Sequence, residues 1–224
     1  SKLAQEVMLK LLQIENVDPN CQNNNETLLS FCILKKYERV VKRLLEFPNL
    51  NISNYISGNG DTYLHLAIAS SRPILKLLLK HNEFDINLPN LQGDTPLLLA
   101  IKERNEELVQ IIINHPRFDP IVSKLNDAFF LSISPPRKLK TTEKAMKEDG
   151  VPQEIMKMII KKENEKALTQ TTKAITRLLL KTGKCDVNYQ HINELNFNQI
   201  DTPLMEAVRA NDEELIGLII SDPL

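Results

Sequence analysis

The side chains able to do chemistry are few and widely spaced. The chain has four histidines and three cysteines, at His65, His81, His115, His191, Cys21, Cys32 and Cys185. The cysteines form no CxxC pair, and no histidine has the spacing to a cysteine or carboxylate that metal ligation or a nucleophile pair requires. Glycine-rich phosphate loops, dinucleotide fingerprints and Gly-x-Ser-x-Gly elbows are also absent. We therefore expect no catalytic residue, no metal site, no cofactor and no enzyme within this segment.

Two acidic clusters have a structural interpretation instead. Glu106-Glu107 and Asp212-Glu213-Glu214 each precede an aliphatic stretch. Acids at the first turn of a helix interact favourably with its dipole, so we expect them to open helices. The odd number of cysteines argues against a disulfide framework and favours a reducing, intracellular, cytoplasmic location.

The composition limits the protein class. The 224 residues include 28 Lys+Arg and 29 Asp+Glu, with 42% hydrophobic and 25% charged residues. These values are typical of a soluble globular protein and exclude a uniformly basic nucleic-acid binder. No apolar run approaches the roughly 20 residues of a membrane-spanning helix. The chain shows no signal peptide and begins Ser1-Lys2 without Met, so we expect a fragment of a longer protein.

One seven-residue pattern recurs along the chain. Residues 62–68 (TYLHLAI) match 95–101 (TPLLLAI) and 202–208 (TPLMEAV), with weaker copies at 27–33 and 127–133. The copies start at positions 27, 62, 95, 127 and 202, which are separated by 35, 33, 32 and 75 residues. Such a period indicates a stack of repeated units without a single central core.

Each copy is followed by an aliphatic block and then by a closing element. The block reads ILKLLL at 74–79 and ITRLLL at 175–180. The closing element reads DIN at 85–87 and DVN at 186–188. Together these blocks predict two short helices and an extended hairpin connection in each unit.

These segments resemble the ankyrin repeat, a unit of about 33 residues with Thr-Pro-Leu-His-x-Ala, Val-x-x-Leu-Leu and Asp-Val-Asn blocks. The resemblance implies an all-α solenoid of stacked antiparallel helix pairs with hairpin loops, here with one helical insertion. It also implies a protein-binding function and a place for His65 in a hydrogen-bond network between units. The Pro or Asn that follows the second helix resembles repeats of secreted effectors of intracellular bacteria, which implies the host cell cytoplasm.

Helix boundaries follow from residue types. A hydroxyl before each first helix is expected to accept an N–H of the first turn, at Thr62, Thr95 and Thr202. Asp127 is expected to cap the fourth copy in the same way. After the second helices we expect Asn82 to take the left-handed conformation, as Gly183 does in the insertion-bearing unit.

We predict one domain over residues 1–224. Its units are a partial N-terminal unit at 1–23, repeats at 24–56, 57–89 and 90–121, a repeat with an insertion at 122–191, and a truncated C-terminal repeat at 192–224.

The inserted segment, at about residues 134–170, is compatible with one long helix, two helices or a cryptic repeat. It carries a basic cluster at Arg137, Lys138, Lys140, Lys144 and Lys147. This cluster is either a site for an acidic partner or lipid head groups, or a solvated loop balanced by nearby acids.

Hairpin tips and first helices line one concave face in this architecture, where side chains are available for recognition. The candidate contact residues are Asn59, Asp61, Ser70, Asn90, Leu91, Gln92, Asp94, Lys102, Glu103 and Arg104. An aliphatic residue at a hairpin tip indicates a contact, although Leu91 would equally suit packing on the neighbouring hairpin.

The sequence therefore favours a monomeric module that binds another protein and no nucleic acid. The alternative is a targeting or substrate-selecting domain of a larger enzyme. A third hypothesis is membrane contact through the basic insertion, at lipid head groups.

Overall fold

The computed structural model describes residues 2–14, 17–24, 26–52, 60–133, 170–192 and 200–221. The chain divides into two compact units. The first unit comprises Ser1–Leu99 and Asn114–Ser123, and the second comprises Ala100–Ile113 and Lys124–Leu224. The division falls within helix α6, so each unit is described by itself.

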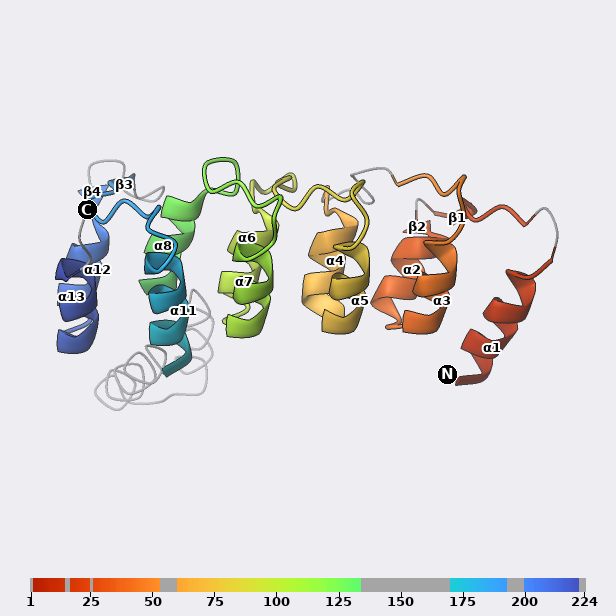
Figure 1. Ribbon diagram of the computed structural model, residues 1–224, viewed down its shortest axis with the longest axis horizontal. Coiled ribbons are helices and arrows are strands. Elements are labelled where there is room, and N and C mark those ends of the chain that lie inside the picture. The colour runs from red at the N-terminus through yellow and green to blue at the C-terminus, as the bar shows by residue number, and fades with distance from the viewer. Residues whose placement is uncertain are drawn as a thin grey trace, which may run out of the picture. The chain divides into compact units, whose positions relative to one another are not determined.

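The first unit consists of short helices joined by tight turns and by longer hairpin connections (Figure 1). Strands β1 and β2 form a minimal antiparallel hairpin in which Gln22 pairs with Thr27. The elements are α1 (Lys2–Leu11), β1 (Gln22–Asn23), β2 (Glu26–Thr27), α2 (Leu28–Leu34), α3 (Glu38–Leu44), α4 (Tyr63–Ser70), α5 (Arg72–Leu78) and the start of α6 (Pro96–Lys102).

The second unit has the same kind of elements. Strands β3 and β4 pair antiparallel, with His191 opposite Asp201. The elements are α7 (Glu106–Ile113), α8 (Leu125–Ile133), α11 (Gln170–Leu180), β3 (His191–Ile192), β4 (Ile200–Asp201), α12 (Pro203–Arg209) and α13 (Glu213–Ile220).

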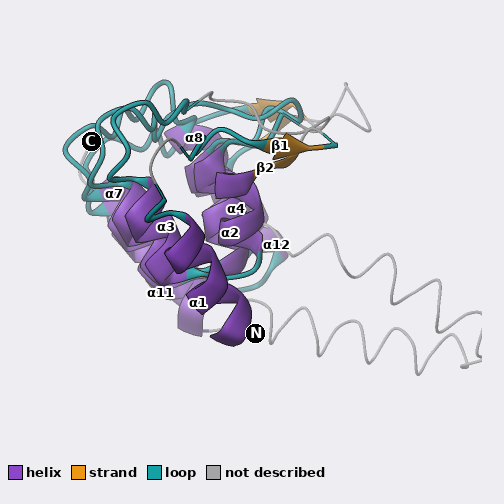
Figure 2. Cartoon of the chain, turned by 90° about the vertical axis from the view of Figure 1, so that its right-hand side faces the viewer, coloured by secondary structure: helices purple, strands orange, loops and turns teal. Residues whose placement is uncertain are grey.

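Within each unit the helices form two layers. In the first unit α2 packs beside α4, while α1 packs on α3 and α3 on α5. In the second unit α8 packs beside α12, and α7 beside α11. For the first unit, Figure 2 shows α2 and α4 on one side and α1 and α3 on the other. Each pair buries its apolar face against a neighbouring pair, so the pairs are stable only when stacked.

Small residues lie where first helices approach closely, as the repeat predicts. Ala67, Ala100 and Ala207 are completely buried, and Cys32 and Ser132 take the same place in the other copies. A larger side chain at these positions would separate the helices and lose the packing of both layers.

The predicted threonine caps are present. The Thr62 hydroxyl accepts a hydrogen bond from the His65 N–H, and Thr202 accepts one from the Met205 N–H. Thr95 accepts from the Leu98 N–H at 3.3 Å. Because each hydroxyl satisfies a first-turn N–H that has no partner within the helix, it fixes where the helix begins.

The prediction for Asp127 is wrong. Helix α8 begins at Leu125, so Asp127 lies inside the first turn and not before it. Its carboxylate instead accepts a hydrogen bond from the Tyr189 hydroxyl at 2.6 Å. The acid therefore joins α8 to the hairpin connection that follows α11.

The prediction for Asn82 is also wrong, because it is not among the residues with positive φ. Gly183 does adopt the left-handed conformation, with φ of 60°. Three described non-glycine residues with positive φ lie instead in the turns between first and second helices: Lys36, Arg104 and Asn211. After α5 the free carbonyl groups are satisfied by an arginine, described below, so no left-handed residue is required there.

Candidate functional site

The hairpin connection between α5 and α6 has a closed set of hydrogen bonds. The Asn90 N–H donates to the Asp94 carbonyl at 2.9 Å, and the Gly93 N–H donates to the Asn90 carbonyl at 2.9 Å. The Asn90 side-chain oxygen accepts from the N–H groups of Gln92 and Asp94, at 3.0 and 2.9 Å. Gly93 has φ of 78°, a conformation that favours glycine. This hairpin tip is therefore ordered by its own side chains.

The same hairpin is joined to the preceding one. The Asn90 amide donates to the Asp61 carboxylate at 2.8 Å. The buried His65 ring lies between the Asp94 carbonyl, 2.8 Å from Nε2, and the Thr62 hydroxyl, 2.8 Å from Nδ1. Burial lowers the pKa of His65, which favours the neutral ring. Because a carbonyl can only accept, Nε2 carries the proton and Nδ1 accepts from Thr62.

Leu91 lies at the tip of this hairpin and is 70% exposed. It also rests on the backbone of the neighbouring hairpin, at Gly60. A Cβ at Gly60 would lie 2.4 Å from the Leu91 Cγ, and Gly60 has φ of 66°. Glycine is therefore required at position 60 both for its conformation and for the space that Leu91 occupies. Leu91 contacts the adjacent hairpin through one side and leaves most of its surface exposed.

The next hairpin connection, residues 114–123, is held by Asn87. The Asn87 side-chain oxygen accepts from the Asp119 N–H at 2.9 Å and from the Ser123 hydroxyl at 2.6 Å. Its amide donates to the Arg117 carbonyl at 2.8 Å. These three contacts make Asn87 a joint between the two connections.

The earlier closing element has the same contacts. The Asn20 amide donates to the Asn49 carbonyl at 2.8 Å, and its side-chain oxygen accepts from the Asn51 N–H at 2.6 Å. These bonds join positions 29 and 31 residues apart. Within the first unit, Asn20 and Asn87 thus make the same kind of joint between successive connections.

Two exposed aliphatic residues of this second connection were missed by the sequence reasoning. The Asp119 carboxylate accepts from the N–H groups of Ile121 and Val122, at 2.8 and 3.1 Å. The turn leaves Ile121 87% exposed and Val122 51% exposed. The sequence signal that could have indicated this exposure is the position of two β-branched residues directly after Asp-Pro and before the next helical pattern.

Arg117 holds the turn that follows helix α5 from the neighbouring connection. Its guanidinium donates to the carbonyl groups of His81, Asn82 and Phe84, at 3.0, 2.6 and 2.9 Å. The charged donor thus satisfies three backbone carbonyl groups of this turn.

The other predicted contact residues of the described chain have varied surroundings. The Ser70 hydroxyl donates to the Leu66 carbonyl at 2.6 Å and the Ile33 carbonyl at 3.3 Å. In the second unit, the Arg104 guanidinium donates to the Ser132 carbonyl at 2.9 Å, and burial lowers its pKa. Lys102 and Glu103 are exposed. Asn59, the inserted segment and its basic cluster lie outside the described residues.

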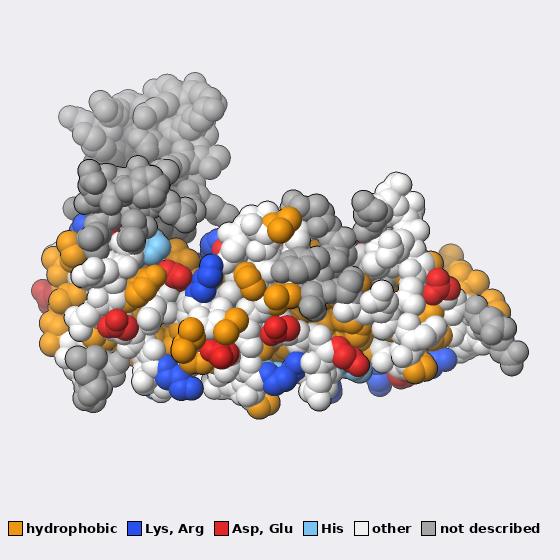
Figure 3. Space-filling model, turned by 90° about the horizontal axis from the view of Figure 1, so that it is seen from above, with side chains coloured by type: hydrophobic (Ala, Val, Ile, Leu, Met, Phe, Trp, Pro, Cys, Tyr) orange, Lys and Arg blue, Asp and Glu red, His pale blue; other side chains and the backbone are white. Residues whose placement is uncertain are grey.

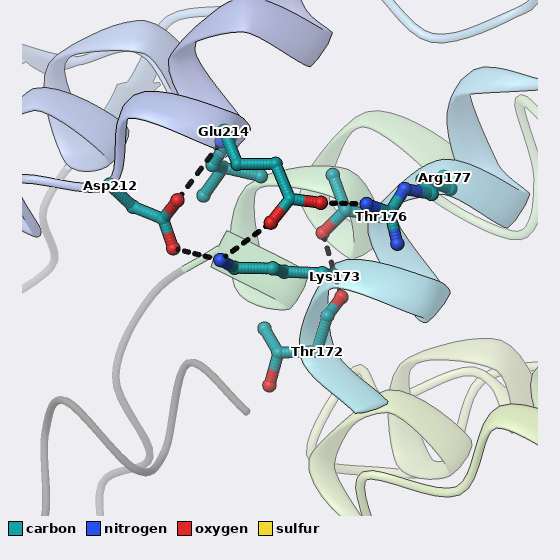
Figure 4. A network of polar contacts seen from close by, with 7 residues as sticks. Thr172, Lys173, Thr176, Arg177, Asp212 and Glu214 are labelled. Atoms are coloured by element: carbon teal, nitrogen blue, oxygen red, sulfur yellow. Dashed lines mark hydrogen bonds and ion pairs between the residues drawn. The ribbon is translucent and has the colours of Figure 1, made fainter. Parts of the chain in front are cut away.

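The acidic triple of the second unit opens α13 and pairs with α11 (Figure 4). The Asp212 carboxylate accepts from the Leu215 N–H at 3.1 Å, which makes Asp212 the cap of the helix. Lys173 lies 3.0 Å from both the Asp212 and the Glu214 carboxylates, and Arg177 also pairs with Glu214. These acids stabilise the helix and its neighbour, as predicted from their position.

The described residues provide no arrangement for catalysis. Burial raises the pKa of the Cys32 thiol to about 12, so the thiol stays protonated and unreactive. Burial and the Asp127 carboxylate raise the pKa of the Tyr189 hydroxyl to about 12. In the part of the chain that the structure describes, no three His, Cys, Asp or Glu residues gather as a metal site would require.

Comparison with known proteins extends these observations. A family model for ankyrin repeats, in three copies, matches residues 2–90 and 48–124. The chain belongs to the ankyrin-repeat family. The prediction of an all-α ankyrin fold is confirmed, and ankyrin repeats are non-catalytic protein–protein interaction modules.

Ankyrin-repeat relatives come from animals and viruses. The chain is 28% identical over 109 residues to the nuclear factor NF-kappa-B p105 subunit of Gallus gallus, covering 46% of this chain and 11% of that protein. It is 33% identical over 82 residues to ankyrin repeat protein 14 of vaccinia virus (strain Western Reserve), covering 36% of this chain and 35% of that protein. The chain thus spans roughly a tenth to a third of the length of these relatives.

The fold is also similar to a solved ankyrin structure. The ankyrin repeat domain of Bcl-3 superposes with a TM-score of 0.60 at 16% identity, covering 98% of this chain and 78% of that chain. Because identity is low, this likeness establishes the fold alone. Among the described helices, none combines the length and apolarity needed to cross a membrane. The repeat boundaries, the bacterial source and the cytoplasmic location stay predictions.

Proposed function

We propose that the chain binds a partner protein through the concave face formed by hairpin tips and first helices. The observation that supports this most strongly is Leu91, which is 70% exposed on a hairpin whose backbone is fixed by hydrogen bonds. A large aliphatic side chain held outward on an ordered loop is typical of a contact residue. The mechanism is rigid display of side chains, with no covalent step.

Some of the predicted residues are exposed for contact with a partner, and others support the hairpin. We assign contact to the exposed side chains Leu91, Gln92, Lys102 and Glu103. Asn90 and Asp61 support the hairpin, since they bond to each other at 2.8 Å. A rigid support lowers the conformational entropy that binding must remove, so both groups contribute to affinity.

Capture of partners from a cell lysate tests this proposal. The bait variant carries alanine at Asn59, Leu91, Gln92 and Lys102, and captured proteins are quantified by mass spectrometry. We expect the specific partner to be lost, because the substitutions remove the central apolar contact and its polar surroundings. Unchanged capture would exclude the concave face.

A matched control shows whether loss of the partner depends on the proposed face or follows from replacing any exposed side chains. Leu3 lies on α1 and is 74% exposed, close to the exposure of Leu91. A variant with Leu3→Ala, Lys42→Ala and Gln110→Ala changes exposed residues of helices outside the proposed face. This control is expected to capture the partner as the unchanged chain does, with the same thermal midpoint.

A second candidate is a targeting or substrate-selecting module of a larger enzyme. The match to curated relatives is compatible with it, since this match covers 11% of the p105 subunit and 35% of ankyrin repeat protein 14. Under this function the concave face selects the substrate or the location of a catalytic domain. The full reading frame tests it, because a catalytic domain in the same chain would support it and a chain of repeats alone would exclude it.

A further inference from the structure

Three aliphatic side chains project from two successive hairpin connections of the first unit. We call Leu91, Ile121 and Val122 the apolar edge; their exposed fractions are 70%, 87% and 51%. Exposed apolar residues that occur singly need no explanation, but these three lie on two successive connections. The apolar edge is therefore a candidate interaction surface.

The two connections lie side by side. The Thr95 hydroxyl donates to the Ser123 carbonyl at 3.1 Å, and the Ser123 hydroxyl donates to the Asn87 side chain at 2.6 Å. Asn87 also accepts from the Asp119 N–H at 2.9 Å. These bonds fix the connection that bears Ile121 and Val122 against the connection that bears Leu91. The connections that bear the three side chains are therefore neighbours within the first unit.

The apolar edge cannot fold inward without loss of hydrogen bonds. The Asp119 carboxylate holds the N–H groups of Ile121 and Val122, so the turn directs both side chains outward. Asn90 fixes the tip at Leu91 through the Gln92 and Asp94 N–H groups. A partner that covers the edge therefore gains apolar burial without first ordering a loop.

The charges around the apolar edge are predominantly negative. The two connections that bear the apolar edge, residues 79–95 and 114–123, carry acids at Glu83, Asp85, Asp94 and Asp119 and basic residues at Lys80 and Arg117. Asp61 lies on the preceding hairpin, and Lys124 follows Ser123 in the sequence. The Arg117 guanidinium is directed to backbone carbonyl groups of the turn after α5. Asp61, Asp85 and Asp119 accept hydrogen bonds from neutral amide N–H groups, which leaves their negative charge in place.

The opposite end of the same helix pairs carries more basic than acidic residues. Lys35 and Lys36 lie in the turn between α2 and α3. Glu38, Arg39 and Arg72 lie at the starts of α3 and α5, and Arg39 pairs with Glu6 at 2.7 Å. Figure 3 looks onto the hairpin side and shows apolar side chains standing among charged ones. A negative surface with apolar side chains attracts a positively charged partner and disfavours an acidic one.

We infer that the apolar edge binds a basic segment of a partner protein in which Lys or Arg alternates with aliphatic or aromatic residues. The apolar side chains of that segment cover Leu91, Ile121 and Val122, and its cations lie against the surrounding carboxylates. This inference rests on the proposed function and names the chemistry of the partner for that same face.

Binding of synthetic peptides to the purified chain tests the inference. Three fluorescent peptides of equal length are compared by anisotropy: alternating Lys and Leu, Glu and Leu, and Lys and Ser. We expect the Lys–Leu peptide to bind roughly tenfold or more tightly than either other peptide, and to weaken as salt is raised. Equal binding of the Lys–Leu and Glu–Leu peptides would overturn the inference.

Substitution of the edge shows where the peptide binds. Leu91→Ser with Ile121→Ser is expected to weaken Lys–Leu binding roughly tenfold, while Leu3→Ser with Val7→Ser on α1 leaves it unchanged. Both variants are checked by thermal unfolding, and the exposed positions predict equal midpoints. Equal affinity of the two variants would contradict the inference, as would a dimer of the chain that the edge substitutions abolish.

The outcomes distinguish this inference from the proposed function. If the edge variant loses the lysate partner but the Lys–Leu peptide shows no preference, the concave face stands and the basic partner is wrong. If neither the lysate partner nor the peptide responds to the edge, both proposals fail.

Discussion

The hairpin connections of the first unit and the α11–α13 pair of the second unit are joined by different chemistry. In the first unit, the side chains of His65, Asn87 and Arg117 bond to backbone groups of a neighbouring connection. In the second unit, α11 and α13 are joined by Lys173 and Arg177 on one side and Asp212 and Glu214 on the other. Bonds to the backbone hold a hairpin whatever side chains it bears, so its tip is available for recognition. Ion pairs hold helices together but depend on the identity of both partners and on salt.

The largest expected effect is at His65. His65→Ala removes a buried ring, takes away the acceptor of the Thr62 N–H, and removes one of the hydrogen bonds that the Asp94 carbonyl accepts. We expect a loss of about 2–4 kcal/mol in the free energy of unfolding, measured by urea denaturation. A loss no greater than that of an exposed-residue variant would show that this joint is not a main support of the hairpin.

The same histidine predicts a pH dependence. Because burial lowers the pKa of His65 below 6.5, the unfolded chain takes up a proton at a pH where the folded ring is still neutral. Stability is therefore complete above pH 6.5 and falls as the pH drops below it. His65→Gln is expected to flatten this part of the stability profile. An unchanged stability profile in the His65→Gln variant would show that other titrating groups cause the pH dependence.

An intermediate effect is expected at the closing asparagine. Asn87→Ala removes bonds to Arg117, Asp119 and Ser123, with an expected loss of about 1–3 kcal/mol. Asn188 is the matched control in the second unit, since it is exposed and its side chain bonds to no described residue. Asn188→Ala should cost less than about 0.5 kcal/mol. Equal losses of unfolding free energy in the two variants would show that the bonds of Asn87 do not stabilise the first unit.

A smaller effect is expected for the ion pairs of the second unit. Lys173 is 21% exposed and Asp212 13%, so Lys173→Met should cost about 0.5–1 kcal/mol in low salt. High salt should reduce the difference between variant and unchanged chain, because it screens the pair. The Asn87→Ala difference should persist at the same salt. A salt-independent Lys173 effect would mean that the lysine acts through packing.

The smallest effect on stability is expected at the apolar edge. Leu91→Ser with Ile121→Ser should change the free energy of unfolding by less than about 0.5 kcal/mol, because these side chains are mostly exposed. A large loss would show that Leu91 serves mainly to pack on Gly60. Leu91 would then be a residue that supports the hairpin, like His65 and Asn87, and not one that contacts a partner.

Local chemistry made much of the fold predictable from the sequence. The hydroxyls of Thr62, Thr95 and Thr202 cap their helices as expected, since a cap depends only on residues three positions apart. Pro96 and Pro203 begin α6 and α12 for the same local reason. The period of the repeat then gave the neighbours of each helix.

Contacts between successive repeats were less predictable. The sequence assigned Asn82 a left-handed conformation, but Arg117, which lies 35 residues later, bonds to the carbonyl group of Asn82 in that turn. It assigned Asp127 to a cap, but Tyr189 bonds to that carboxylate across 62 residues. Leu91 was selected because hairpin tips are exposed, whereas Ile121 and Val122 were missed because their turn depends on Asp119 and Asn87. Long-range partners of this kind are not encoded in the spacing of one repeat.

Hydrogen–deuterium exchange of the chain, with and without the partner captured from lysate, tests the central claim most directly. We predict slowed exchange in the hairpin connections at residues 88–95 and 119–123, with little change in α3 and α5. That result would place the partner on the face that Leu91, Ile121 and Val122 occupy. Protection confined to α3 and α5, with unchanged exchange in both connections, would contradict the account.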